Sequence, residues 1–462
     1  MPVQPYPYVI LDGALMDTDL THFGTKPVVL DGISLDWGRS EYLSHAETAT
    51  LTISFVDRTG TLAQKVTGRR MIGAPLAVFY TDAPGSPWGA CWFQGRVNAA
   101  TAHPSTRDPF SDDPKAKAWT VTLTAADKTA DLGQIVQPPG NWPQENAQQR
   151  AVRIRDGSAI AGIGQFYFYP GHTGSLMWEI DVKGRDNLAL VKDFYMSMGD
   201  TFSYLPKENN IRYLHRRAYD MHVSLIRDDD GVIRARAADY TFDNRLYRGI
   251  GIQSCEVTAA DSTTVPTQST ITRVETSWKD IPNGGRDWVT VVWDDTLPEH
   301  NWGRRTLTLT SWLGDGRQID PVTLELLNRG RFEGSIPRHP DITVDTRRTG
   351  GFHSKGEAEA FLEGGETQGV AYVSGSQHAQ WQFITPVYAI IGGTITYRHP
   401  GWVITCRLQA CWRTNLATPP TWTGMAAAIT WGPPGHGGNL SESLTWFDMT
   451  FLDNGTVYES EP

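Results

Sequence analysis

Short segments in which apolar and polar residues alternate recur along this sequence from residue 27 onward. In 33–37, Ile, Leu and Trp alternate with Ser and Asp, and the segments 50–55 and 119–124 repeat the pattern with Thr and Ser at the polar positions. Successive side chains of a strand point to opposite faces of a sheet, so this alternation is typical of strands with one buried face. We therefore expect a mainly β fold with a smaller α+β part.

The first block of strands predicts a small β-barrel or sandwich over 27–139, preceded by an N-terminal arm over 1–26. Five or six short strands fall within about 100 residues, with Gly and Pro between them, as in small closed sheets. The segment 105–117, rich in Asp and Pro, reads as a long exposed hairpin tip.

The pattern changes near residue 140, where the apolar spacing becomes helical. One helix is expected from Trp142 to about Ile160, with Pro143 in its first turn, and a second from Leu188 to Met198, closed by Gly199. Strands follow at 201–205, 211–215 and 220–226. We predict an α+β domain over 140–246.

A second β block is expected over 247–412. Strong strand patterns occur at 271–278, 287–293 and 305–312, and the next ones at 388–391, 393–398 and 402–408. A Gly-rich insertion at 314–380 separates the two groups, with weak helical signals at 321–327 and 357–362. Two related barrels flanking the α+β module are the architecture that we infer, with an irregular β-like C-terminal extension at 413–462.

Composition excludes several classes of protein. The 462 residues include 40% apolar and 20% charged residues, which is typical of a globular chain. A net charge of −10 opposes binding to nucleic acid through clustered cations. The N-terminus lacks the features of a signal peptide, and the longest apolar runs are too short for a membrane helix, so we expect a soluble protein.

No residue pattern predicts a catalytic, cofactor or metal site. Phosphate-binding glycine motifs, a zinc-protease helix and a serine nucleophile elbow are all missing from the sequence. The segment 228–231 begins like a calcium loop but lacks the Glu at the twelfth position, and a charged hairpin turn accounts for it. The dispersed histidines are interpreted as structural, and the cysteines as buried thiols, with a Cys406–Cys411 disulfide as the alternative; the residues are His172, His215, His222, Cys91, Cys255, Cys406 and Cys411.

Two side-chain types leave alternatives open. Paired carboxylates (Asp294 with Asp295, Glu357 with Glu359) could serve a glycosidase, although a solvated surface explains them as well. Tryptophans could stack on sugars, although packing in a core or a subunit interface is the simpler interpretation. These tryptophans are Trp88, Trp92, Trp278, Trp288, Trp293, Trp302 and Trp312.

The order of the segments resembles the minor tail proteins of long-tailed phages, especially phages of actinobacteria. The resemblance covers roughly residues 25–412. The segments 28–39, 49–57, 93–97 and 119–128 look like the first barrel of those proteins, and 142–156, with Arg150 and Arg153, is similar to the helix that follows it. The segments that resemble the interrupted second barrel are 271–278, 391–397 and 401–408.

The resemblance implies a structural tail-tip hub of the virion, with no enzymatic activity and no cofactor. It implies a homotrimer whose six barrels form a pseudo-sixfold ring around the exit channel for the genome, with DNA passing through unbound. The implied partners are the distal tail protein, the tape-measure protein and other tip or fibre proteins, without membrane insertion. Two alternatives remain open: a receptor- or carbohydrate-binding adsorption protein, and a wall hydrolase that uses carboxylates.

Overall fold

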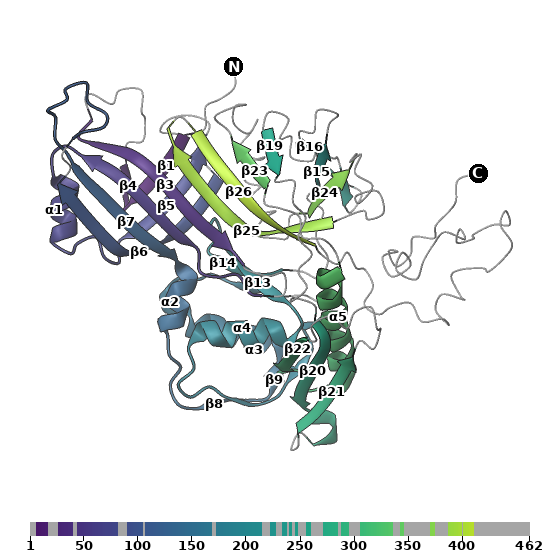
Figure 1. Ribbon diagram of the computed structural model, residues 1–462. Coiled ribbons are helices and arrows are strands. Elements are labelled where there is room, and N and C mark those ends of the chain that lie inside the picture. Colours follow the sequence, from purple (N-terminus) through teal and green to yellow (C-terminus); the bar gives the residue numbers. More distant parts are fainter. Residues whose placement is uncertain are drawn as a thin grey trace.

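The structure is a computed structural model of the 462-residue chain. The residues that it describes are 6–16, 26–39, 44–81, 90–104, 107–168, 172–214, 222–227, 233–237, 240–242, 245–247, 256–259, 271–284, 288–294, 305–335, 342–345, 370–374, 387–399 and 401–410. Strands predominate, which confirms the mainly β fold. Two β units lie side by side, with the helical part of the chain on one side of both (Figure 1).

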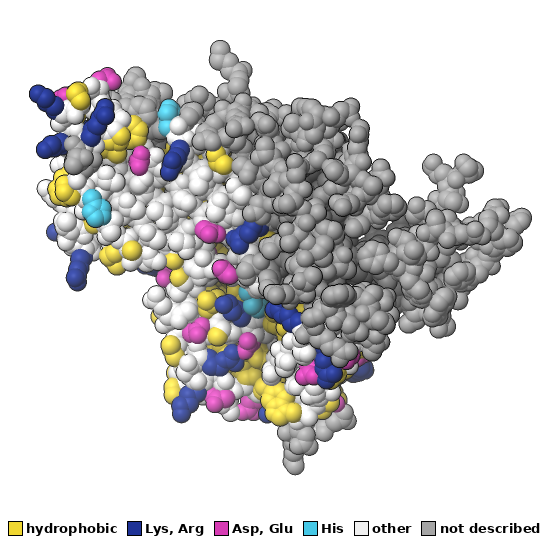
Figure 2. Space-filling view, viewed as in Figure 1, with side chains coloured by type: hydrophobic (Ala, Val, Ile, Leu, Met, Phe, Trp, Pro, Cys, Tyr) yellow, Lys and Arg dark blue, Asp and Glu magenta, His cyan; other side chains and the backbone are white. Residues whose placement is uncertain are grey.

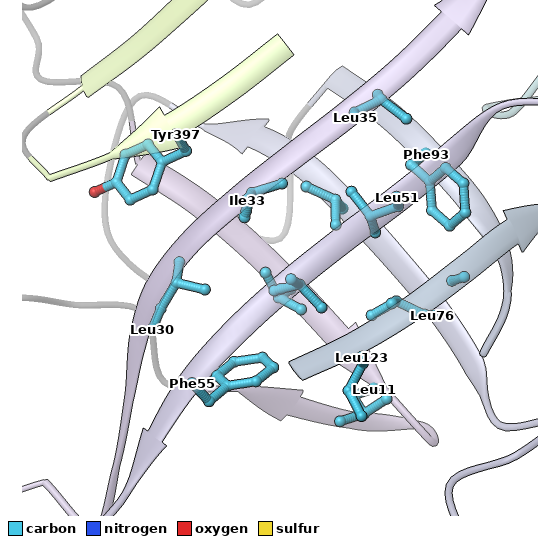
Figure 3. Packing of buried hydrophobic residues seen from close by; sticks show 14 of the residues in the cluster. Leu11, Leu30, Ile33, Leu35, Leu51, Phe55, Leu76, Phe93, Leu123 and Tyr397 are labelled. Carbon is cyan, nitrogen blue, oxygen red and sulfur yellow. The ribbon is translucent and has the colours of Figure 1, made fainter. Parts of the chain in front are cut away.

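The first β unit is an antiparallel sheet whose strands follow the spatial order β2-β1-β5-β6-β7-β4-β3. The alternation seen in the sequence is realised in β4 and β7, whose apolar side chains point into a common core (Figure 3). The outermost strands β1 and β2 come from the segment predicted as an arm. The strands are β1 (Tyr6–Leu11), β2 (Ala14–Met16), β3 (Val28–Gly38), β4 (Thr50–Asp57), β5 (Pro75–Thr81), β6 (Ala90–Pro104) and β7 (Trp119–Asp127).

Two short helices follow strands of this unit, and a buried aspartate accepts hydrogen bonds from the first turn of each. Asp57 accepts hydrogen bonds from the backbone N–H groups of Leu62 and Ala63 at the start of α1 (Thr61–Thr67). Asp127 is the N-cap of α2 (Lys128–Gln134) and accepts from the Thr129 N–H. These carboxylates satisfy the N–H groups that a helix start leaves without partners.

The second β unit is a closed ring of strands in the order β25-β24-β15-β16-β19-β23-β26, closed by the pairing of β26 with β25. A closed ring leaves no open sheet edge. Two of its strands, β23 and β24, come from the segment predicted as an insertion. The strands are β15 (His222–Arg227), β16 (Ile233–Ala237), β19 (Glu256–Ala259), β23 (Ile342–Asp345), β24 (Val370–Ser374), β25 (Val387–Arg398) and β26 (Gly401–Ala410).

The two β units share a strand arrangement. In each, a hairpin lies beside three antiparallel strands: β3–β4 beside β5-β6-β7, which are successive strands of the sequence, and β25–β26 beside β16-β19-β23, which are separated by other elements. Both hairpins carry one bulge at the same place, between Leu30 and Gly32 in β3 and between Ile390 and Gly392 in β25. The two units therefore share this strand arrangement, although the hairpin precedes the three strands in one unit and follows them in the other.

The units are joined edge to edge through β3 and β25, and the hairpin β25–β26 also completes the core of the first unit. Trp402 is fully buried there, with its ring centroid 4.6 Å from that of Trp92 on β6. Tyr397 of β25 points into the same core as Leu35 and Phe93 (Figure 3).

The α+β part packs two helices and several short strands around its own core. The first helix begins at Ala147 and not at Trp142, because Asn146 and Gln149 form a capping box and Trp142 lies in a strand. The second ends as predicted, with Gly199 at φ 72°. The elements are β8 (Asn141–Trp142), β9 (Glu145–Asn146), α3 (Ala147–Gly157), the 3-10 helix η2 (Ala159–Ala161), β10 (Phe166–Tyr167), β11 (Leu176–Met177), β12 (Ile180–Asp181), α4 (Asn187–Ser197), β13 (Thr201–Leu205) and β14 (Asn210–Leu214).

Three strands predicted for the second barrel form a separate sheet in the order β21-β20-β22. Trp278 and Trp312 pack into the core of the α+β part, while Val274 and Leu309 pack on α5 residues Val322 and Leu326. We call the α+β part and this sheet with its helix the lower lobe. The elements are β20 (Ile271–Lys279), the 3-10 helix η4 (Ile281–Asn283), β21 (Trp288–Asp294), β22 (Arg305–Thr310) and α5 (Gly316–Ser335).

The remaining described strands, β17 (Tyr240–Phe242) and β18 (Arg245–Tyr247), form a two-stranded hairpin. Several predictions concern residues outside the described part of the chain: the calcium-like segment 228–231, the helical signal at 357–362 and the extension at 413–462.

Candidate functional site

The lower lobe holds a buried arginine at its centre. The Arg150 side chain is fully buried, and its Nε donates to Glu145 Oε1 at 2.5 Å. Its Nη2 donates to the backbone carbonyls of Pro143 and Trp178, at 2.9 and 3.1 Å. Because a buried charge is costly unless it is paired, these contacts fix α3 against β8 and the segment around Trp178.

The same guanidinium lies between two tryptophan rings. The Arg150 carbon Cζ is 5.7 Å from the ring centroid of Trp142 and 5.3 Å from that of Trp312. A cation over aromatic faces is stabilised by the ring quadrupoles, more so when desolvated. Arg150 thus connects the α+β core to the segment that follows β22.

Glu145 also forms an ion pair with a second arginine. Arg153 Nη2 lies 2.8 Å from Glu145 Oε2. Burial raises the pKa of Glu145, but the hydrogen bonds from Arg153 and Arg150 outweigh it and hold the pKa below its ordinary value. A lowered pKa keeps this carboxylate ionised, so it acts as a structural anion and not as a proton donor.

A pair of tryptophans, one partly buried and one exposed, lies near this cluster. The rings of Trp178 and Trp288 meet edge to face with centroids 5.1 Å apart, and Lys279 Nζ lies 5.0 Å and 5.5 Å from their respective centroids. Trp288 is 52% exposed. This pair is a surface at which a planar apolar ligand or a protein side chain could stack.

Apolar exposure continues along β21. Val289 and Val292 of this strand are exposed together with Trp288, and β21 is an outer strand of its sheet. Further large apolar side chains are exposed on α3, on η2 and around β10, and Figure 2 shows apolar side chains at the surface of the lower lobe. Clusters of exposed apolar residues mark contact surfaces.

A junction between the lobe and both β units encloses a cavity of about 40 Å³, room for a water molecule or two. Arg39, at the end of β3, donates from Nη1 to Thr201 Oγ1 at 2.9 Å and from its backbone N to the Ile391 carbonyl at 2.7 Å. The ring of His45 stacks on Phe202 with centroids 5.0 Å apart. This cavity is too small for an organic substrate.

Two titratable groups at this junction have shifted pKa values. Burial, together with the nearby cations Lys192 and Arg39, lowers the pKa of His45 to about 3. Burial raises the pKa of Asp127 to about 6, although hydrogen bonds from Thr129 and Ala49 favour its ionised form. His45 is therefore neutral at pH 7.

The tryptophans singled out in the sequence mostly serve packing. Trp92, Trp278 and Trp312 are buried, and Trp293 Nε1 donates to Asp320 Oδ1 at 2.8 Å on α5. Trp288 is the exposed one, and sequence alternation could not distinguish it because its strand lies at a sheet edge. Trp88 and Trp302 lie outside the described residues.

The other sequence candidates do not come together in the described residues. His172 Nδ1 lies 3.3 Å from Ser175 Oγ, Asp294 pairs with Arg273, and Cys406 is buried in the core of the first unit. Cys91 is partly buried. The residues His215, Cys255, Asp295, Glu357, Glu359 and Cys411 lie outside the described part, as does the side chain of His222.

Within the described ranges, no group of three or more His, Cys, Asp or Glu side chains could hold a metal ion. In the same ranges, the helices are all too short or too polar to cross a bilayer. The Arg150 cluster was not predicted from the sequence. The feature that could have indicated it is the spacing of Glu145, Arg150 and Arg153 at the start of a helix.

Comparison with known proteins identifies solved structures that share the fold. No protein-family model and no curated protein sequence matches the chain. A tail protein from Neisseria meningitidis MC58 has a similar structure, with a TM-score of 0.50 and 12% identity over 88% of this chain and 96% of that one. The 43 kDa tail protein of prophage MuSo2 from Shewanella oneidensis gives a TM-score of 0.51 and 12% identity over 87% and 98%. The chain therefore has the fold of these phage tail proteins.

Proposed function

We propose that this protein is a structural component of a phage virion, the hub of a tail tip. One observation carries the proposal: two related β units lie side by side in one chain that has the fold of known tail proteins. Related units repeated within a chain allow a small number of copies to build a ring of higher pseudosymmetry. We propose no catalytic role.

In this proposal three copies form a ring of six β units around a channel. The ring joins the distal tail protein above to a threefold tip below, and it contacts the tape-measure protein and other tip or fibre proteins. DNA passes through without specific binding, because a chain of net charge −10 repels the phosphates of DNA on average. The protein would be made in the host cytoplasm, would not insert into a membrane, and would reside in the virion.

The oligomeric state tests this proposal. Light scattering on the purified chain should give a mass three times that of the 51.3 kDa chain, and the complex with the distal tail protein of the same phage should weigh more by the mass of the bound partner. A chain that stays monomeric even with its distal-tail partner present would contradict the proposal.

A second candidate function is receptor or carbohydrate binding at the tail tip. The exposed Trp288 beside the partly buried Trp178 favours it, because aromatic faces stack on sugar rings. A pulldown on host wall material should then retain the wild-type chain but not the Trp288→Ala variant, in which the buried Trp92 is left unchanged. Equal retention of both proteins, or of neither, removes this candidate.

A further inference from the structure

The exposed side of α3 lines an open groove of about 820 Å³ in the lower lobe, which we call the α3 groove. The segment 142–145, which precedes the helix, and Gln137 also line it. A volume of this size lies in the range of sites that hold organic ligands, unlike the small cavity at the junction with the β units. The lower lobe therefore offers a concave surface that is large enough to bind a ligand.

Arg153 is the one cation among the residues that line this groove, and Glu145 occupies only one edge of its guanidinium. Arg153 Nε lies 2.9 Å from Glu145 Oε1, and Nη2 lies 2.8 Å from Glu145 Oε2. Within the described ranges, Nη1 makes no hydrogen bond, and the side chain is 41% exposed. Because a guanidinium has five N–H groups in a fixed fork, the edge formed by Nη1 and Nη2 can bind a second carboxylate through two hydrogen bonds.

The charges at the groove leave one positive charge unbalanced. Glu145 is ionised, because its pKa is held below the ordinary value, and it is shared by the two guanidinium groups of Arg150 and Arg153. The other acidic residue of the groove, Asp156, is balanced by Arg155, whose Nη2 lies 2.9 Å from Asp156 Oδ1. A ligand with a single negative charge therefore matches the groove, whereas a phosphate polymer needs several cations along its length.

Glutamine amides make up most of the remaining polar lining. Gln144 and Gln148 are exposed, and their side chains make no hydrogen bond in the part of the chain that the structure describes. Gln149 Oε1 accepts from the Asn146 N–H at 3.0 Å, which leaves its NH2 group for another acceptor. Amides both donate and accept, so they can pair with the N–H and C=O groups of a peptide. Trp142 is only 7% exposed, so its ring offers little face on which a sugar could stack.

We propose that the α3 groove binds an extended peptide segment of a partner protein that carries one Asp or Glu. The carboxylate lies on the Nη1–Nη2 edge of Arg153, and the peptide bonds on either side pair with the glutamine amides. Val152, which is 40% exposed in the groove, provides an apolar contact for the segment. This inference does not depend on the proposed hub, because it concerns a ligand site on the lower lobe and not the assembly of the β units.

The test measures how well the full-length chain retains two mixtures of short synthetic peptides, with mass spectrometry as the readout. Peptides of the first mixture have Glu at the centre and uncharged residues on both sides, and those of the second have Gln at the centre. The wild type should retain the Glu mixture about tenfold better, since hydrogen bonds between charged groups are the stronger ones.

Two arginines of the same helix provide matched variants. Arg153→Lys keeps the charge but loses the fork, so it should retain the Glu mixture about tenfold less well. Arg155→Lys is the control, because Arg155 is 43% exposed and does not line the groove. Gln148→Glu leaves the pair of Arg153 with Glu145 in place and adds a like charge to the groove, so it should also lower retention. All three variants should keep the thermal midpoint of the wild type.

The outcomes separate this inference from the proposed function. Equal retention of both mixtures by the wild type overturns the inference, as does equal retention of the Glu mixture by the Arg153→Lys and Arg155→Lys variants. Displacement of the peptides by chitin oligosaccharides would assign the groove to a sugar instead. A wild type that binds the Glu mixture as expected but stays monomeric with its distal-tail partner would contradict the hub proposal and leave the peptide site standing.

Discussion

Leu35 of β3 lies directly opposite Ile395 of β25, and the strand pairing on either side of this pair is symmetric. Trp37 faces Gly393, and at the other end Ile33 faces Tyr397. Since Leu30 and Gly32 correspond to Ile390 and Gly392 by their shared bulge, Leu35 corresponds to Ile395 and Trp37 to Tyr397. Equivalent strands of the two units therefore pair with each other about a local twofold axis. The junction between the units thus consists of corresponding residues from each unit.

Around β25 the backbones of both neighbouring strands, β26 and β3, come so close that side chains are excluded. A Cβ on Gly393 would lie 1.8 Å from the Thr405 carbonyl oxygen, and a Cβ on Gly38, at φ 94°, would lie 2.2 Å from Gly392 Cα. Gly393→Ala should therefore destabilise the chain by about 2 kcal/mol or more, since backbone must move. Urea unfolding measures this. Gly174→Ala, where a Cβ meets nothing within 4 Å, is the control, and an equal loss in both would contradict the close approach.

The hairpin β25–β26 should be essential to the first unit. Trp402 is fully buried against Trp92 and Tyr80, so Trp402→Ala should cost about 3–5 kcal/mol. Trp288→Ala, at an exposed ring, should cost under about 1 kcal/mol. Thermal unfolding, monitored by near-UV circular dichroism, distinguishes the two variants. A Trp402 variant as stable as the Trp288 variant would show that the hairpin does not complete this core.

Glu145→Gln should destabilise the lower lobe strongly. The change removes the carboxylate that Arg150 and Arg153 share and leaves the buried Arg150 charge uncompensated, a loss of about 3–5 kcal/mol. The exposed pair of Arg155 and Asp156 provides the control, because Asp156→Asn should cost under about 1 kcal/mol. Denaturant titration compares them, and similar midpoints would mean that Arg150 is adequately held by the Pro143 and Trp178 carbonyls.

Lowering the pH should reduce the unfolding free energy of the chain, because His45 is protonated when the chain unfolds. Its pKa is lowered to about 3 in the folded chain from about 6.5 in the unfolded chain, so the folded state binds the proton less readily. Its contribution to stability is complete above pH 6.5 and falls as the pH drops toward 3, by up to about 1.4 kcal/mol per pH unit. His45→Phe keeps a ring on Phe202 and removes the titration, so its unfolding free energy should fall less steeply between pH 6.5 and 4. Parallel pH profiles for the two proteins would contradict this.

Local elements followed from the sequence because their signals are local. Alternation predicted β4 and β7, and the apolar spacing from Leu188 with Gly199 predicted α4, which ends as expected. The start of α3 was misplaced because the capping box at Asn146 outweighs Pro143 as a helix signal. The helix α1 was missed because it is only one or two turns long and depends on Asp57, a strand residue, for its cap.

Pairing between distant strands could not be derived in this way. The pattern of β20 is the same whether it packs in a barrel or under a helix, and only the contacts of Trp278 and Val274 show which occurs. Likewise, nothing local in Leu35 indicates Ile395 as its partner. The buried state of Arg150 also depends on Trp142 and Trp312, which are far apart in the sequence.

We propose a ring built from paired β units, and electron microscopy of the purified chain with its distal-tail partner would image such a ring. We expect a closed ring of three copies with six similar lobes of density around a channel, and with the lower lobes gathered at one end. Isolated monomers, or a ring whose copies contribute one β unit each, would contradict it.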